Sequence, residues 1–301
     1  MKELNALIKR NTKLYFKDKG MFLTSLITPI VLLVLYVTFL GNIYEASFRS
    51  VLEAAGAAAP DPLVGGCVGG QLASSLLAVC CVTVAFCSNV LMVQDKATGA
   101  RRDLTMTPVS RGTLALGYYI ANLLSTLLVC FGAAAVCLLY LSRIGWYMTG
   151  TDVALLLLDV LLLSLFGSVL SSIINFFLSS QGQISAIGTI ISAGYGFICG
   201  AYMPISNFSE GLQKALSFLP GTYGTCLLRN HLLRGVFAEM GAQGFPEQAV
   251  DAIRDAVDCN IYFFDAKVEM GTMYLVLGGA VLVLTGVYVL LNILTGKRKH
   301  R

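Results

Sequence analysis

Long stretches of nearly uncharged, apolar residues dominate the sequence, and their length limits what the chain can fold into. Crossing about 30 Å of hydrocarbon takes roughly 20 helical residues. Six stretches reach this length: 21–41, 63–93, 112–141, 153–177, 183–203 and 271–295. Backbone groups inside a bilayer must bond within their own segment, and the sequence lacks the alternating pattern of a membrane β-barrel. We therefore expect an all-α, polytopic membrane protein with six transmembrane helices.

The low content of charged residues supports the same conclusion. Asp, Glu, Lys and Arg make up 13% of the 301 residues, about half the share found in soluble domains, whereas hydrophobic residues make up 56%. A chain with so few charges cannot cover its surface with polar groups in water. Lipid is therefore expected to be its main solvent.

The positions of Lys and Arg predict the orientation in the membrane. These residues gather before the first apolar stretch, between the second and third, and after the last. The connections on the opposite side carry more acidic than basic residues. Because cytoplasmic flanks collect Lys and Arg, we expect both termini in the cytoplasm and the protein in the plasma (inner) membrane. The net charge of +4 then has a topological cause and does not indicate a nucleic acid partner.

The first twenty residues have the pattern of an amphipathic helix. Lysine and arginine side chains project from one face, and the other face carries Leu4, Leu7, Ile8, Asn11, Leu14 and Tyr15. Such a helix is expected to lie along the membrane surface, with its basic face near anionic headgroups. The alternative is a frayed, charged terminus.

A charged connection lies between the second and third stretches. Asp95 is suited to cap a short helix there, and Pro108 to end it, because the residue before a proline avoids helical geometry. Ser110 can then cap the third span. The pattern predicts a short helix over 95–107 in the cytoplasm, with Leu104 and Met106 available to a partner. Taken alone, the connection also fits an ordinary basic flank of a membrane span.

Several of these features together resemble a known family. They are the amphipathic first helix, the six spans, and the D-K-x-x-G-x-x-R-D-L-x-x-T-P-V-S-R pattern that begins at Asp95. The run Gly200-Ala201-Tyr202-Met203-Pro204, followed by Leu219-Pro220 and Arg229, completes the set. In this order they resemble the ABC-2 type permeases, the membrane subunits of ATP-driven exporters.

The resemblance implies that the connection is a coupling helix seated on a separate ABC ATPase subunit. ATP and Mg would then be bound by that ATPase, with no cofactor on this chain, and a second permease copy or homologue would complete the pathway. The positions that fall in the coupling motif are Asp95, Lys96, Gly99, Arg101, Arg102, Asp103, Leu104 and Pro108. Many relatives have other residues at positions 100 and 102, where this chain has Ala100 and Arg102.

The same resemblance implies one transmembrane domain over residues 1–301. Its parts are an interfacial helix (1–20), spans one to five (21–203), an outer loop (204–270), span six (271–295) and a cytoplasmic tail (296–301). The outer loop is expected to form short helices that dip back towards the membrane and cap the export path. Phe208, Leu212, Leu216 and Leu219 form an approximate helical stripe that Pro220 interrupts. The alternative is an ordinary surface loop.

Enzyme chemistry is poorly represented in the sequence. No G-x-x-x-x-G-K-[ST] motif is available to bind ATP phosphates. The two histidines, His231 and His300, do not assemble a metal site or a Ser-His-Asp arrangement. We therefore expect a transport subunit without an ATPase site, a catalytic site or a metal.

Asp159 is the one charged residue within the six stretches. An ionisable group inside a bilayer is costly and suggests a functional site. It fits either a polar wall of the substrate path, including a proton-linked site, or a hydrogen-bonded acid at a helix interface. Secondary carriers use such acids, so a proton- or ion-coupled secondary transporter is the competing function, and a membrane enzyme or scaffold is a third.

Cysteines give little information about disulfides. Seven of the nine lie within the apolar stretches, where they act as small apolar residues. Cys226 and Cys259 lie in the outer loop, where an oxidising compartment could join them. The alternatives are one disulfide or two free thiols.

Overall fold

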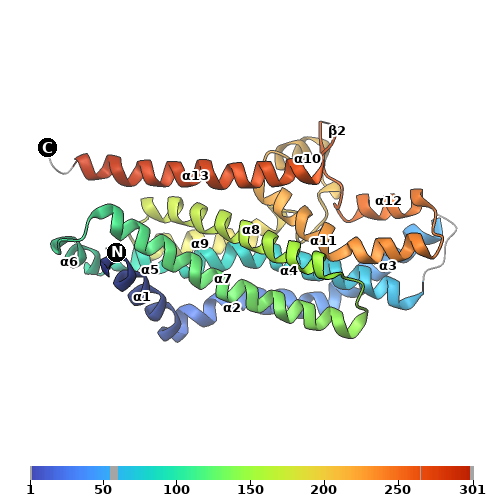
Figure 1. Ribbon diagram of the computed structural model, residues 1–301, viewed down its shortest axis with the longest axis horizontal. Coiled ribbons are helices and arrows are strands. Elements are labelled where there is room, and N and C mark those ends of the chain that lie inside the picture. Colours follow the sequence, from blue (N-terminus) through green and yellow to red (C-terminus); the bar gives the residue numbers. More distant parts are fainter. Residues whose placement is uncertain (1, 55–59, 265, 299–301) are drawn as a thin grey trace.

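The computed structural model describes residues 2–54, 60–264 and 266–298, and it consists almost entirely of helices (Figure 1). The all-α prediction is confirmed. The long helices are α2 (Lys19–Leu35), α4 (Asp61–Ser88), α7 (Arg111–Ile144), α8 (Gly150–Phe177), α9 (Gln181–Ile198), α11 (Pro220–Ala242) and α13 (Met270–Arg298). The shorter elements are α1 (Lys2–Lys17), η1 (Tyr36–Leu40), α3 (Gly41–Ala54), α5 (Val90–Ala97), α6 (Ala100–Met106), η2 (Ile205–Asn207), α10 (Glu210–Leu216), α12 (Glu247–Ala256), β1 (Tyr262–Phe263) and β2 (Ala266–Lys267).

Five helices in the described part of the chain are long and apolar enough to cross a bilayer. They cover Lys19–Ser50, Asp61–Ala97, Arg111–Ile144, Gly150–Phe177 and Met270–Leu294. The expected fifth span, 183–203, forms α9, which has 18 residues and is about 27 Å long at 1.5 Å per residue. Gln181 and Gln183 lie in its first turn. The structure thus has the helices of a multi-pass membrane protein, and the sixth span stays a prediction.

The first long helix extends beyond the expected end at residue 41. A π-helical turn, η1, follows α2, and α3 continues the helix to Ala54. Gly41 keeps helical geometry, with φ −53° and ψ −49°, so it does not end the helix. Beyond it, Arg49 pairs with Glu45 at 2.9 Å, one turn away. These charges mark where the helix leaves an apolar environment.

Local sequence signals set the starts of α7 and α8. The Ser110 hydroxyl accepts a hydrogen bond from the Thr113 amide at 3.0 Å, which confirms the predicted cap of α7. Thr149 and Asp152 form a reciprocal capping box at the start of α8. Both caps satisfy amide groups that have no partner within the helix.

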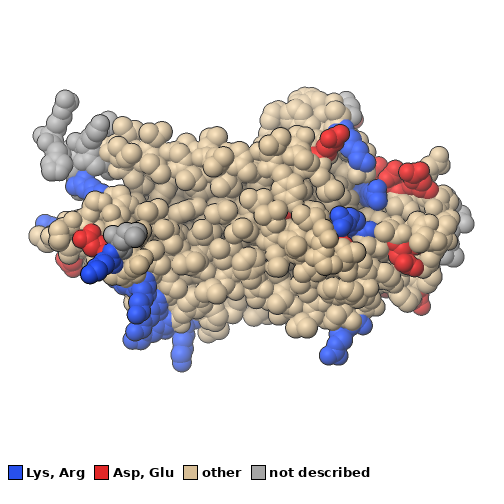
Figure 2. All heavy atoms as spheres, viewed as in Figure 1, with Lys and Arg blue, Asp and Glu red and all other residues tan. Residues whose placement is uncertain are grey.

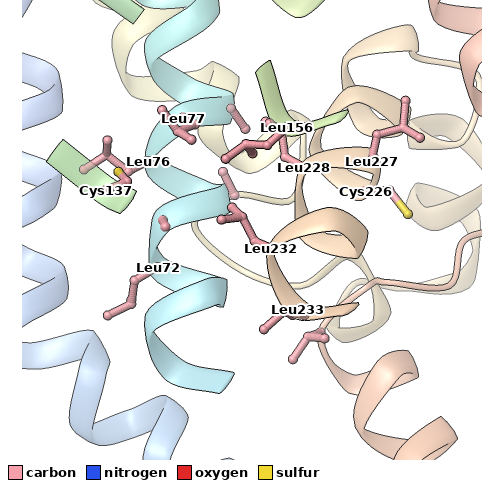
Figure 3. Close-up of a cluster of buried hydrophobic side chains, with 14 of the residues drawn as sticks. Leu72, Leu76, Leu77, Cys137, Leu156, Cys226, Leu227, Leu228, Leu232 and Leu233 are labelled. Carbon is pink, nitrogen blue, oxygen red and sulfur yellow. The ribbon is translucent and has the colours of Figure 1, made fainter. Parts of the chain in front are cut away.

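Helix α4 lies at the centre of the bundle. It packs against α2, α7, α8, α9 and α11. Figure 3 shows Leu77 of α4 near Leu156 of α8 and Leu228 and Leu232 of α11, whereas Leu72 and Leu76 point to the other side of α4, where Cys137 of α7 lies. At Gly70 a Cβ atom would lie 2.5 Å from the Leu233 side chain, so glycine allows this close approach of α4 and α11.

The segment expected as an outer loop, 204–270, is largely helical. Pro220 ends the preceding turn and stands at the first position of α11, as the sequence indicated. Most residues of α11 from Gly221 to Met240 are buried, and the helix packs against α4, α8 and α13. It is therefore part of the core and not a surface loop.

Helix α1 packs on the protein and does not only lie along a surface. Its buried residues, Leu7, Asn11 and Tyr15, come from the predicted stripe and face α7. At Gly117 of α7 a Cβ atom would lie 2.9 Å from Leu7, so a small residue is needed at this contact. The Tyr15 hydroxyl also donates to Ser25 of α2 at 2.7 Å. Part of the stripe therefore packs against the protein, and other residues of it, such as Leu14, are exposed.

The molecule is elongated, and its two ends differ in charge. Helices α1 and α6 and the C-terminal end of α13 lie at one end, while α3 and α12 lie at the other (Figure 1). Lys and Arg side chains are visible around both ends, whereas most visible Asp and Glu side chains lie at the second (Figure 2). The long sides between them show almost no charge. This distribution is expected of a protein whose waist is covered by lipid.

Candidate functional site

The predicted coupling connection forms two helices and not one. Helix α5 ends at Ala97, and Gly99 turns the chain with φ +87°, in the left-handed region that favours glycine. Helix α6 then runs from Ala100 to Met106. Thr107 is extended before Pro108, as predicted. The prediction that Asp95 caps a helix over 95–107 is wrong, because Asp95 lies within α5.

The Asp95 carboxylate is used for a contact between helices. Arg10 of α1 donates to it with Nη1 at 2.8 Å, and Tyr118 of α7 donates with its hydroxyl at 2.6 Å. The Asp95 side chain is 8% exposed and that of Arg10 is 32% exposed. The hydrogen bond to Asp95 raises the pKa of the Arg10 guanidinium. Asp95 therefore ties α5 to α1 and α7.

Lys96 makes the corresponding contact with α8. Its Nζ donates to the carbonyl oxygens of Asn175, Phe176 and Leu178 at 2.8, 2.8 and 3.0 Å. The last carbonyls of a helix lack partners within it, and a cation there is favoured by the helix dipole. Lys96 thus caps α8 and is not available to a partner protein. The contacts of Asp95 and Lys96 are called the anchoring contacts below.

A polar joint lies one to two turns before these contacts. Asn89 separates α4 from α5, and its Nδ2 donates to the hydroxyls of Ser171 and Ser172, each at 3.1 Å. Asn175 donates back to the Asn89 carbonyl at 3.2 Å. The break between α4 and α5 is therefore held by α8 through hydrogen bonds.

The remaining motif residues differ in whether they pack against the protein or are exposed. Leu104 is half-buried and packs against a cluster that contains Leu7 and Tyr118, so part of its side chain is covered by the protein, and its availability to a partner stays a prediction. Met106 is 79% exposed. Arg101 is half-buried, and Pro108 is exposed. The exposed face of α6, called the α6 face below, consists of Arg102, Asp103, Thr105 and Met106.

Asp159 is fully buried and lies between three helices. Its Oδ2 contacts His231 Nδ1 of α11 at 2.5 Å, and its Oδ1 accepts a hydrogen bond from the Tyr274 hydroxyl of α13 at 2.6 Å. Sequence reasoning identified Asp159 but missed both partners. A buried acid needs hydrogen-bond donors, but no local sequence pattern identified His231 or Tyr274 as those donors.

A second buried polar cluster links the outer elements. Arg229 of α11 pairs with Asp258 at 3.1 Å and also donates to the Gly200 carbonyl. Asp258 accepts from the amides of Ile205 and Ser206 at 2.6 and 3.3 Å. Burial raises the pKa of the Asp258 carboxyl, although the Arg229 charge opposes this shift. The pair fixes the chain after α9 against the chain after α12.

Cys226 and Cys259 lie next to this cluster as two free, buried thiols. The Cys226 Sγ approaches the Cys259 carbonyl oxygen at 3.2 Å. Of the two alternatives, a disulfide or two free thiols, the structure has two free thiols at Cys226 and Cys259.

Comparison with known proteins now adds to this geometry. Residues 2–233 match the ABC-2 type transporter family, which is most of the chain. The chain belongs to this family. It is therefore a multi-pass membrane permease of an ABC transporter. The match covers α1, the α5–α6 connection, Asp159 and Arg229. No curated protein matches the permease in a sequence search.

Proposed function

We propose that this permease exports its substrate from the cytoplasm with energy from ATP hydrolysed on a separate ATPase subunit. The α6 face is the docking surface for that ATPase, which holds ATP and Mg. A second copy of the permease, or a homologue, completes the pathway. The sixth span is α9, and the end that carries α6 is cytoplasmic.

The observation that supports this proposal is the combination of an exposed face and a fixed support. Met106, Arg102 and Asp103 point away from the protein, whereas the anchoring contacts hold the neighbouring α5 against three helices. A displacement of α6 would therefore reach α1, α7 and α8 together. A loop without these contacts would move alone, and force from an ATPase would not be transmitted.

The docking experiment replaces the most exposed apolar residue of the α6 face. Met106→Asp places a charge where a partner would bury an apolar side chain, which costs several kcal/mol when the charge is unpaired. We expect loss of ATPase co-purification with normal insertion of the permease. Leu212→Asp, at a 43% exposed leucine of α10, is the matched control and should retain ATPase binding. Full ATPase binding and export by Met106→Asp would contradict the proposed docking surface.

The competing function is a proton-coupled carrier that uses Asp159. The contact of Asp159 with His231 and Tyr274 supports it, because these three groups can exchange a proton inside the protein. Asp159→Asn keeps the size of the side chain and removes the acid. ATP-dependent export that persists in this variant would eliminate the carrier, whereas loss of transport with intact ATPase binding would favour it.

A further inference from the structure

An apolar groove lies along one side of the bundle, between α2, α4 and α7. Its volume is about 470 Å³. The aromatic rings of Phe16 and Phe22 line one end, and Tyr36 and Tyr140 lie towards the other. Gly132 of α7 contributes to its wall, and a Cβ atom there would meet no other atom within 4 Å. The groove is thus open at Gly132 and lined by apolar side chains.

The groove is longer than the hydrocarbon part of one bilayer leaflet. Along α2 it extends from Phe22 to Tyr36, about 21 Å at 1.5 Å per residue. Along α7 it extends from Leu128 to Tyr140, about 18 Å. Half of the hydrocarbon core is about 15 Å thick. A chain that enters at the Phe16 end therefore reaches the bilayer centre within the groove.

Two lysines lie near the end of the groove that Phe16 lines. Lys13 precedes Phe16 by three residues, and Lys19 precedes Phe22 by three, so each lysine lies on the same helix face as its phenylalanine, one turn away. Both lysines are exposed. Figure 2 shows Lys and Arg side chains projecting below α1 and the start of α2. At the opposite end of the groove, Tyr140 lies one turn before Arg143, which is also exposed.

We propose that the groove binds one phospholipid with an anionic headgroup, taken from the leaflet on the α1 side. An acyl chain lies along α2 and α7, and the phosphate is held by Lys13 and Lys19. The apolar lining and a length greater than one leaflet match an acyl chain, and the exposed lysines at the Phe16 end match an anionic headgroup. A second copy of the permease would also match the apolar lining, and it would increase the oligomeric mass without retaining lipid.

Filling the groove tests the position of the acyl chain. Gly132→Leu places a side chain in the open space of the wall, and Leu128→Trp is a second variant at a 61% exposed residue of the same groove. Gly286→Leu is the matched control, because Gly286 of α13 is also exposed with nothing within 4 Å of its Cβ position. Native mass spectrometry measures phosphatidylglycerol retained by each purified permease. We expect loss of the retained lipid in both groove variants and no loss in the control.

Removing the lysines tests the headgroup. Lys13→Gln and Lys19→Gln should each weaken phosphatidylglycerol binding about fivefold and leave phosphatidylcholine binding unchanged. Equal retention of the two lipids by the wild-type permease would overturn the proposal, as would full retention by both Gly132→Leu and Leu128→Trp. A groove variant that alters the oligomeric mass while lipid binding persists would assign the groove to a second copy and also overturn it.

Discussion

The contact of Lys96 with the end of α8 gives a direct test of the anchoring contacts. In Lys96→Met the side chain keeps a similar length and apolar stem but loses all three hydrogen bonds to the carbonyls of Asn175, Phe176 and Leu178. The cation that faces the C-terminal end of α8 is lost as well. We expect the permease to be less stable and α5 to separate from α8.

The expected loss is about 2–3 kcal/mol. A hydrogen bond from a charged donor contributes about 1.5–3 kcal/mol, but three bonds here share one ammonium group. Fixing a lysine side chain opposes them by up to about 2 kcal/mol of rotamer entropy. For a chain of this size about 1 kcal/mol corresponds to about 2 °C in Tm, so the shift should be about 5 °C.

Thermal unfolding in mild detergent measures this shift through the fluorescence of Trp146, the single tryptophan. Arg102→Met is the matched control, because it also removes a cation from the α5–α6 connection but from an exposed position. It should change Tm by about 1 °C or less, as expected for an exposed charge. Equal Tm values for Lys96→Met and Arg102→Met would refute the capping role of Lys96.

Three further predictions follow from the topology, the thiols and the outer cluster. Labelling of introduced cysteines should place two groups of positions on opposite sides of the membrane. The cytoplasmic group is Lys19, Arg102 and Lys299, and the outer group is Glu53, Arg143 and Asp255. Labelling of position 102 from outside would contradict the six-span topology. Burial raises the pKa of Cys259 to about 12 and that of Cys226 well above its usual range. Neither thiol should therefore react with maleimide at pH 8 until the permease is unfolded. A Thr105→Cys thiol on the exposed α6 face should react at once. Asp258→Asn leaves Arg229 as an unpaired buried charge and should cost about 3–5 kcal/mol in thermal unfolding, and Arg229→Met in the same chain should restore part of it.

Signals that depend on a few neighbouring residues were readable from the sequence. Ser110 caps α7 as predicted, and Pro108 ends α6 through the extended conformation of Thr107. Five of the expected spans also form long apolar helices. Capping and hydropathy are properties of a short window, so no knowledge of the tertiary structure was needed.

Contacts between distant residues were not readable. Asp95 and Lys96 look like solvent-exposed charges in a basic flank, yet each is paired with a helix far away in the sequence. His231 lies in a segment with Arg229 and Arg234, whose charges lower its mean hydropathy, so nothing local indicates that α11 is buried. The structure shows that Arg229 pairs with Asp258 and Arg234 with Asp152, and that His231 contacts Asp159; such contacts are tertiary properties.

The division of the α5–α6 connection into anchoring and exposed residues predicts two different kinds of defect. Met106→Asp acts on the α6 face and should prevent ATPase binding. The double variant Asp95→Asn with Lys96→Met leaves that face unchanged, but it removes the charge that pairs with Arg10 and the three Lys96 hydrogen bonds to the end of α8.

The double variant should therefore bind the ATPase and hydrolyse ATP while export falls, because movement of α6 no longer reaches the bundle. Co-purification measures binding, and ATP hydrolysis and export are measured on the same reconstituted vesicles. Loss of ATPase binding in both variants would mean that Asp95 and Lys96 merely shape the docking surface. Normal export by the double variant would mean that movement reaches the bundle by another route, such as the packing of Leu104 against Leu7.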